Sequence, residues 1–328
     1  MKAKYRIMAV TPNLHDAMSY YRTVCPLLRL EEEYNDVEVV FGSPDADYSW
    51  DTFMRFNILF IQRPSTEKHL DLILKAKRHG LKVWVDIDDL LWGVTIDSPA
   101  FAHFNQQKTK ELIKQCLFEP DLVTTSTQLL LDKTLEFTKR EKPIHVVRNA
   151  VDFNAEPTFK NGDGILWRGS HTHQADLLEH KEALINFGKQ SKAIYYFYGY
   201  APWFIMNSVN CNHYGYFDDL TEYFRTVKTH AYSLAVAPLV DNDFNRCKSD
   251  IAALEAVMAG TTPLGPDWAE WSAYPRYTPE NLLEKMTAIH ESTEMVKYDG
   301  WLRMVNYIKQ YRTLRLANEF RYTLIQSL

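Results

Sequence analysis

Short apolar runs alternate with amphipathic segments along the whole chain. In the first half, such runs predict buried β-strands at 6–10, 37–41, 58–61, 82–85, 122–125 and 145–147. The clearest helical periodicity lies at 66–79, where Leu70, Ile73 and Leu74 share one face and Gly80 can end the helix. Strands that alternate with helices predict a parallel sheet covered on both faces.

The second half repeats this alternation. Its apolar runs predict strands at 165–167, 194–198, 213–214 and 234–237. Its amphipathic segments predict helices at 174–187, 220–229 and 249–259. Asp219 and Glu222 have the spacing of a capping box, and Gly188 and Gly260 stand where helices should end.

A polar stretch divides the two halves. It begins near residues 148–152 and closes on the turn-rich segment 161–164. We therefore predict an α/β fold with two Rossmann-like parallel-sheet domains, 1–150 and 151–300, facing each other across a cleft. Residues 301–328 predict a C-terminal helix that either closes the second domain or returns onto the first. Ligands of open α/β sheets bind beyond the carboxyl ends of the strands, so chemistry is expected there.

Composition narrows the class of protein. With 46% hydrophobic and 24% charged residues, the chain has the balance of a globular protein. Its formal net charge is −5, and neither half is basic, so general electrostatic binding to nucleic acid is not indicated. The four cysteines are widely spaced and form no CxxC pair, which argues against a zinc site or a disulfide framework. Without an apolar stretch of signal-peptide or membrane-spanning length, we expect a cytoplasmic protein with no membrane insertion.

The first candidate for chemistry is the segment 165–173. An apolar strand runs into Gly169 and Ser170, and a helix begins shortly afterwards. A glycine lets a phosphate approach the backbone, a helix N-terminus offers free N–H groups, and Arg168 and His173 could add positive charge. An ordinary strand-to-helix turn is the alternative interpretation.

The second candidate, 236–260, carries more signal. A buried strand leads into a polar loop with Arg246 and Lys248, and Ser249 is the predicted N-cap of the next helix. Both cations would face a diphosphate at the helix start. Glu255 falls on or beside the buried face of this helix, where a carboxylate is costly unless it is bonded. A ribose diol would satisfy it, and a structural arginine is the alternative.

Three carboxylates follow the strand predicted at 82–85, namely Asp86, Asp88 and Asp89. They could act as a general base or bind an acceptor hydroxyl. They could also hold Mg²⁺ or Mn²⁺, or serve only as loop caps. We rank an acceptor-side or structural role above a metal site.

Several of these segments resemble one known family. "WRGSHTHQADL", "RNAVD", "LEAVMAG" and "TTPLG" resemble the donor-binding module of GT-B glycosyltransferases, specifically the family 4-like group, while "SYYR" and "VDIDDLLW" resemble a subset of it. The resemblance implies that Glu255, as the second glutamate of a Glu-x7-Glu signature, holds the donor ribose. Three features depart from the family pattern: Cys247 replaces the first glutamate, Ser170 follows Gly169 where arginine is usual, and 11–13 lacks the usual glycine-rich loop.

By this resemblance, the chain moves a hexose or pentose from a nucleotide-sugar donor to an acceptor hydroxyl, with retention and without a metal. The nucleotide sugar is a co-substrate, and no further cofactor is expected. The expected catalytic residues are Asp88, Asp89 and Lys248. The expected donor-binding residues are Gly169, Ser170, His173, Arg246, Lys248, Ser249 and Glu255.

Two acceptor classes stay open: a saccharide, and a hydroxymethylated base in phage-type DNA. A DNA acceptor would need a local basic patch, for which the candidates are Lys75, Lys77, Arg78, Lys108, Lys110 and Lys114. Two other functions also stay open. The missing first glutamate would suit a catalytically inert nucleotide-sugar-binding subunit, and the same architecture serves sugar-nucleotide epimerases.

Overall fold

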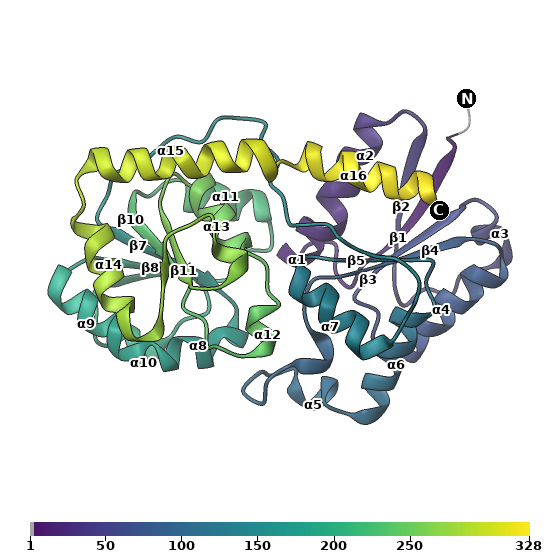
Figure 1. The fold of residues 1–328 in the computed structure, drawn as a ribbon, viewed down its shortest axis with the longest axis horizontal. Helices are drawn as coiled ribbons and strands as arrows, with labels where there is room; N and C mark the ends of the chain where they lie inside the picture. The colour runs from purple at the N-terminus through teal and green to yellow at the C-terminus, as the bar shows by residue number, and fades with distance from the viewer. Residues whose placement is uncertain (1–2) are drawn as a thin grey trace.

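Two separate parallel sheets of six strands each form the framework of the computed structural model, which describes residues 3–328 (Figure 1). The first sheet has the order β2-β1-β3-β4-β5-β6. Its strands are β1 (Tyr5–Val10), β2 (Val37–Gly42), β3 (Ile58–Gln62), β4 (Lys82–Ile87), β5 (Leu122–Thr125) and β6 (Ile144–Val146). All six fall within two residues of the predicted strands.

The second sheet has the order β12-β11-β10-β7-β8-β9. Its strands are β7 (Gly164–Gly169), β8 (Tyr195–Gly199), β9 (Cys211–Tyr214), β10 (Tyr232–Val236), β11 (Pro263–Pro266) and β12 (Arg276–Tyr277). The sequence did not predict the last two strands, because β11 reads Pro-Leu-Gly-Pro and β12 is only two residues long. Every strand pairing in both sheets is parallel, which confirms the predicted fold class of two Rossmann-like domains.

Helices cover both faces of the first sheet (Figure 1). They are α1 (Ala17–Ser19), η1 (Tyr20–Val24), α2 (Cys25–Glu33), α3 (Trp50–Phe53), α4 (Glu67–Arg78), η2 (Leu91–Gly93), α5 (Phe101–Phe104), α6 (Gln107–Phe118) and α7 (Gln128–Thr138). The turn η1 is a π-helix, a rare form that is often found at functional sites. Gly80 follows α4 with φ +79°, as the sequence predicts, and Thr66 is the N-cap of this helix.

The helices of the second half are η3 (His171–His173), α8 (Gln174–Glu179), α9 (Lys181–Ser191), α10 (Trp203–Met206), α11 (Leu220–Val227), α12 (Asp243–Arg246), α13 (Ile251–Met258), η4 (Ala269–Trp271), η5 (Pro279–Asn281), α14 (Leu282–Glu291), α15 (Glu294–Tyr311) and α16 (Leu314–Ser327). Three helix predictions were wrong. The helix predicted at 174–187 is two helices broken at His180, and Gly188 lies inside α9, whose C-cap is Lys192 instead. The N-cap of α13 is Asp250 rather than Ser249.

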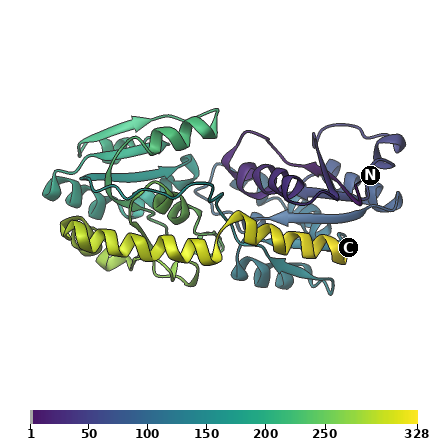
Figure 2. The same cartoon turned by 90° about the horizontal axis from the view of Figure 1, so that it is seen from above.

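The two C-terminal helices run end to end across both domains (Figures 1 and 2). Helix α15 contacts α13 in the second domain, and α16 contacts α2 in the first. Position 300, the predicted end of the second domain, falls inside α15. Arg312 is buried where the two helices meet. It pairs with Asp250 at 2.5 Å and donates two hydrogen bonds to the carbonyl of Asn149. The C-terminal segment thereby braces the domain junction.

The loop between β10 and α13 docks on the first domain. Cys247 is fully buried and belongs to the same apolar cluster as Val83, Val85 and Val123 of the first sheet. Thr127 Oγ1 donates to the Cys247 carbonyl at 2.8 Å. This docking holds the start of α13 against the first domain.

Candidate active site

A cavity of about 580 Å³ lies between the two sheets. It is lined by the segments that follow β1, β3 and β4 in the first domain and by those that follow β7 and β10 in the second. Strand order reverses between β1 and β3 and between β7 and β10, so the cavity lies at the switch points of both sheets. Open α/β sheets bind their ligands at such points.

The three candidate carboxylates of the first domain are each held by an arginine. Asp86 is buried outside the cavity and accepts hydrogen bonds from Arg22 Nε at 2.9 Å and Nη2 at 2.6 Å. Asp88 and Asp89 line the cavity, and the guanidinium of Arg63 forms ion pairs with both of them. Arg63 directly follows β3 and has φ +49°, a backbone conformation that side chains rarely adopt. Sequence reasoning did not identify Arg63, although a cation directly after a buried strand was an available signal.

The two cavity carboxylates differ in acidity. Burial, together with the negative charge of Asp89, raises the pKa of Asp88 to about 6. Burial acts in the same direction on Asp89, but the positive charges of Arg63 and Lys248 outweigh it and lower the pKa of Asp89. Asp89 therefore stays ionised at neutral pH, whereas Asp88 can exchange a proton near pH 6.

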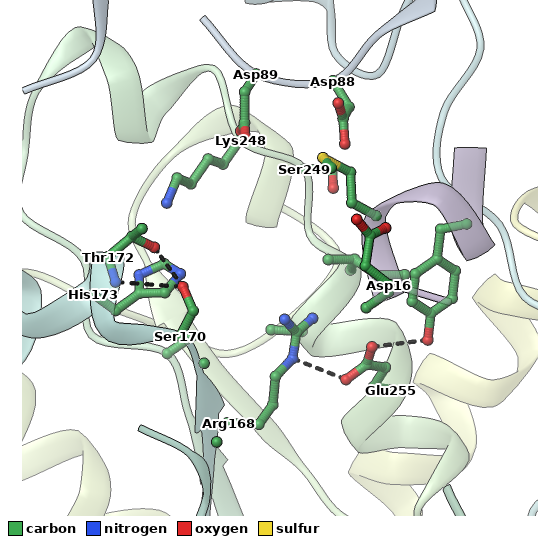
Figure 3. Close-up of a pocket in the computed structure, with 18 of the residues that line it drawn as sticks. Asp16, Asp88, Asp89, Arg168, Ser170, Thr172, His173, Lys248, Ser249 and Glu255 are labelled. Carbon is green, nitrogen blue, oxygen red and sulfur yellow. Dashed lines mark hydrogen bonds and ion pairs between the residues drawn. The ribbon is translucent and has the colours of Figure 1, made fainter. Parts of the chain in front are cut away.

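Glu255 faces the cavity from α13 with only 9% of its surface exposed (Figure 3). Its Oε1 accepts a hydrogen bond from Tyr21 Oη at 2.8 Å, and Tyr21 belongs to η1 of the first domain. Its Oε2 accepts one from Tyr223 Oη at 2.9 Å and lies 2.8 Å from Arg168 Nε. The alternative of a structural arginine partner is thus observed: two phenols donate hydrogen bonds to the carboxylate, and Arg168 contacts it as an ion pair.

Two cations keep unused donors in this cavity. Arg168, the penultimate residue of β7, has a buried Nη2 that lacks a partner among residues 3–328. Within the same described range, Lys248 Nζ makes no ion pair or hydrogen bond, and it lies 4.9 Å from the centre of the Phe244 ring. Burial lowers the pKa of Lys248. Figure 3 shows the two side chains on opposite sides of the same space.

The predicted turn after β7 forms one wall of the cavity. Gly169, Ser170 and His173 line it, and a Cβ at Gly169 would stand 3.0 Å from the His173 ring. His173 Nδ1 lies 2.7 Å from Asp176, which fixes the ring, and burial lowers the pKa of His173. On the opposite wall, Ser249 Oγ accepts a hydrogen bond from Asn149 at 2.7 Å.

One predicted donor-binding residue is not brought to the site. Arg246 lies outside the cavity, pairs with Asp241 and stands over the ring of Trp268 at 5.9 Å. Cys247 is equally remote, because it is buried in the core of the first domain. The position that the family signature assigns to its first glutamate therefore does not face the cavity.

Surface features outside the cavity bear on other functions. In the predicted basic patch, Lys75, Lys77 and Lys108 each form an ion pair with a carboxylate, which lowers the positive potential that the patch offers to a phosphate backbone. Among residues 3–328, no group of three His, Cys, Asp or Glu side chains is arranged to hold a metal ion. Over the same range, no helix combines the length and the apolar character needed to cross a bilayer.

The chain was compared with known proteins. No profile of a protein family matches it, and no curated protein matches its sequence. Solved structures match it over nearly its whole length. It is similar to Anabaena HepE in complex with UDP, at 12% identity and a TM-score of 0.69 over 100% of both chains.

Two further structures show the same likeness. An E. coli structure described as trehalose-6-phosphate bound with UDP-2-fluoro glucose matches at 11% identity and a TM-score of 0.64, over 98% of this chain and 99% of that one. The N-terminal domain of Candida albicans trehalose-6-phosphate phosphatase matches at 10% identity and a TM-score of 0.65, over 100% and 97%. With its two six-stranded parallel sheets, the chain has the GT-B fold of glycosyltransferases.

Proposed function

We propose that this protein transfers a sugar from a nucleotide-sugar donor to an acceptor hydroxyl. The observation that carries the proposal is that two cations and a carboxylate of the second domain all line the interdomain cavity. Arg168 and Lys248 offer unused cationic donors, and the carboxylate of Glu255 lies on the same α13 helix whose first residues, Ile251 and Ala252, also line the cavity. Free N–H groups at a helix start and two cations suit a diphosphate, and a carboxylate suits a ribose diol.

Within this proposal, the second domain binds the donor. The diphosphate lies between Arg168 and Lys248, above the turn formed by Gly169 and Ser170, and Glu255 binds the ribose. Arg168 takes the place that the sequence hypothesis gave to Arg246, because only Arg168 faces the cavity. The cavity of about 580 Å³ is in the range that encloses small-molecule ligands.

The first domain presents the acceptor. Asp88 accepts a hydrogen bond from the acceptor hydroxyl, while Asp89 balances the charge of Lys248. The acceptor oxygen bonds to the anomeric carbon as the bond from that carbon to the phosphate oxygen breaks. In a transfer with retention, the hydroxyl proton passes to the departing phosphate on the same face of the sugar. Growing negative charge on the diphosphate is stabilised by Arg168 and Lys248, so the proposed reaction needs no metal.

A saccharide is the preferred acceptor in this proposal. A hydroxymethylated base in DNA is less favoured, because carboxylates neutralise three lysines of the only basic patch that the sequence indicates. Hexosyl and pentosyl transfer both fit the cavity. We also propose that the protein works in the cytoplasm, since its four cysteines are free thiols.

A catalytically inert nucleotide-sugar-binding subunit is the second candidate. It is favoured by Cys247, which leaves the position of the first signature glutamate buried away from the cavity. Turnover separates the two candidates, because an inert subunit would bind a donor without releasing free nucleotide.

A panel of nucleotide sugars tests the proposal. The cognate donor should raise the melting temperature by mass action, and a donor at 100 times its dissociation constant should add about 2.7 kcal/mol to the free energy of unfolding. Release of free nucleotide from that donor, measured with and without oligosaccharide acceptors, then shows transfer. If no nucleotide sugar or nucleoside diphosphate raised the melting temperature, the proposed function would be wrong.

A further inference from the structure

We infer that Tyr21 is a donor-site residue contributed by the opposite domain, and that it competes with one ribose hydroxyl for the carboxylate of Glu255. This inference rests on the proposed function and adds a residue that sets nucleotide affinity. Tyr21 and Glu255 both line the cavity, both are at least nine-tenths buried, and their 2.8 Å hydrogen bond crosses from one domain to the other.

The argument begins from the capacity of a carboxylate. Two carboxylate oxygens offer about four positions for hydrogen-bond donors. Tyr21 and Tyr223 each fill one position with a hydrogen bond, on Oε1 and on Oε2, and Arg168 Nε occupies a third as an ion pair 2.8 Å from Oε2. One position is free, whereas a ribose diol brings two hydroxyls. A diol bound through both hydroxyls must therefore displace one of the three donors.

Tyr21 is the donor that can leave. Arg168 is bound by charge as well as by contact, and Tyr223 belongs to the same domain as Glu255. Tyr21 instead belongs to the π-helix η1 of the first domain, so its bond to Glu255 depends on how the two domains lie. Burial raises the pKa of Tyr21 far above its usual value, so the phenol keeps its proton and is the donor in its hydrogen bond to Glu255.

The displaced ring has space to enter. A second cavity of about 230 Å³ lies behind Tyr21 at the domain junction. Tyr21, Tyr223 and Glu255 line both cavities, so these three side chains form the wall between them. The rest of the second cavity is mainly apolar, with Val151, Met258, Leu314 and other apolar residues. An aromatic ring can move into such a space without losing apolar contacts.

One consequence concerns the product. After transfer, the ribose of the free nucleotide and the phenol of Tyr21 compete for the carboxylate of Glu255. The phenol therefore weakens binding of the nucleotide, and it does so through the ribose end rather than the diphosphate. A nucleotide with a single ribose hydroxyl takes the one free position on Glu255 and does not meet this competition.

The test compares two variants and two nucleotides by calorimetric titration. UDP and 2′-deoxy-UDP are titrated into the wild-type protein, Tyr21→Phe and Tyr20→Phe. Tyr20 is a matched control, because it is the neighbouring phenol on η1 and makes no hydrogen bond to Glu255. Tyr21→Phe should bind UDP about ten-fold more tightly, roughly the equivalent of one net hydrogen bond. Its affinity for 2′-deoxy-UDP, and both affinities of Tyr20→Phe, should match the wild type.

Each other outcome overturns the inference. Weaker or unchanged UDP binding by Tyr21→Phe would show that Tyr21 supports Glu255 or has no effect on it. An equal gain for both nucleotides would show that the effect does not involve the second hydroxyl. These results would leave the proposed function standing if wild-type protein binds UDP. If the wild type bound no nucleoside diphosphate at all, the proposed function would fail and the inference with it.

Discussion

Replacement of Lys248 by methionine separates a catalytic role from a structural one. Lys248 has a half-buried side chain near the charges of Asp89 and Asp176, yet its Nζ makes no ion pair or hydrogen bond among residues 3–328. Methionine keeps an unbranched apolar side chain against Phe244 and removes only the charge. If Lys248 stabilises the departing diphosphate, its loss should affect the rate of transfer much more than the binding of donor.

The expected size follows from the type of interaction. Removing one preorganised group that stabilises charge in a transition state costs about 2.7–4 kcal/mol, so kcat should fall about 100- to 1000-fold. The donor Kd should rise by no more than about ten-fold, because full negative charge develops only as the bond breaks. The melting temperature should stay equal or rise, since the variant removes a half-buried charge that has no ion-pair partner among residues 3–328.

Steady-state kinetics, donor calorimetry and a melting curve on the same preparation give the three numbers. The neighbouring variant Arg246→Met is the matched control, because Arg246 lies outside the cavity and should change none of them strongly. A lower melting temperature with unchanged kcat would refute the reasoning, since it would make Lys248 a structural residue. An equal change in kcat and Kd would refute the assignment to the departing diphosphate.

Two further predictions concern metal and pH. Transfer should survive EDTA, because Arg168 and Lys248 supply the positive charge; full loss of activity restored by Mn²⁺ would place a metal at Asp88 and Asp89. The rate of transfer should rise with pH through about 6 as Asp88 ionises. The Asp88→Asn variant should be slower, and its rate should not rise over this pH range. The raised pKa means that protonated Asp88 stabilises the fold at low pH, and this stabilisation is lost as pH rises through about 6. Asp88→Asn should therefore flatten the melting temperature between pH 4 and 7, and a wild-type pH dependence in this variant would contradict the assignment.

Most strands could be predicted because each is a short apolar run between helices. The sequence also predicted Gly80 and Gly260 at helix ends, where φ is +79° and +91°. It failed where local signals favoured another structure. Strand β11 reads Pro-Leu-Gly-Pro, a pattern typical of a turn, and it is a strand only because β10 and β12 flank it. Gly188 is tolerated inside α9 because Val209 and Tyr195 pack so close that a Cβ would stand 2.6 Å and 3.0 Å from them.

The site was less predictable than the fold because its contacts join distant parts of the chain. The sequence predicts that Glu255 binds either a ribose diol or a structural arginine. It does not reveal that Tyr21, 234 residues away, donates a hydrogen bond to the same carboxylate. Arg246 and Lys248 look equivalent in the sequence. The short helix α12 turns Arg246 towards Asp241 and leaves Lys248 in the cavity.

Donor binding by Glu255→Gln tests the central claim most directly. The variant keeps the shape of the side chain and removes the charge that should accept hydrogen bonds from the ribose. A hydrogen bond to a charged group contributes about 1.5–3 kcal/mol, so calorimetric titration with the cognate donor should show affinity about ten- to a hundred-fold weaker than wild type. A donor Kd equal to that of the wild type, with a lowered melting temperature, would show that Glu255 only joins Arg168 and Tyr21, and that the nucleotide binds elsewhere.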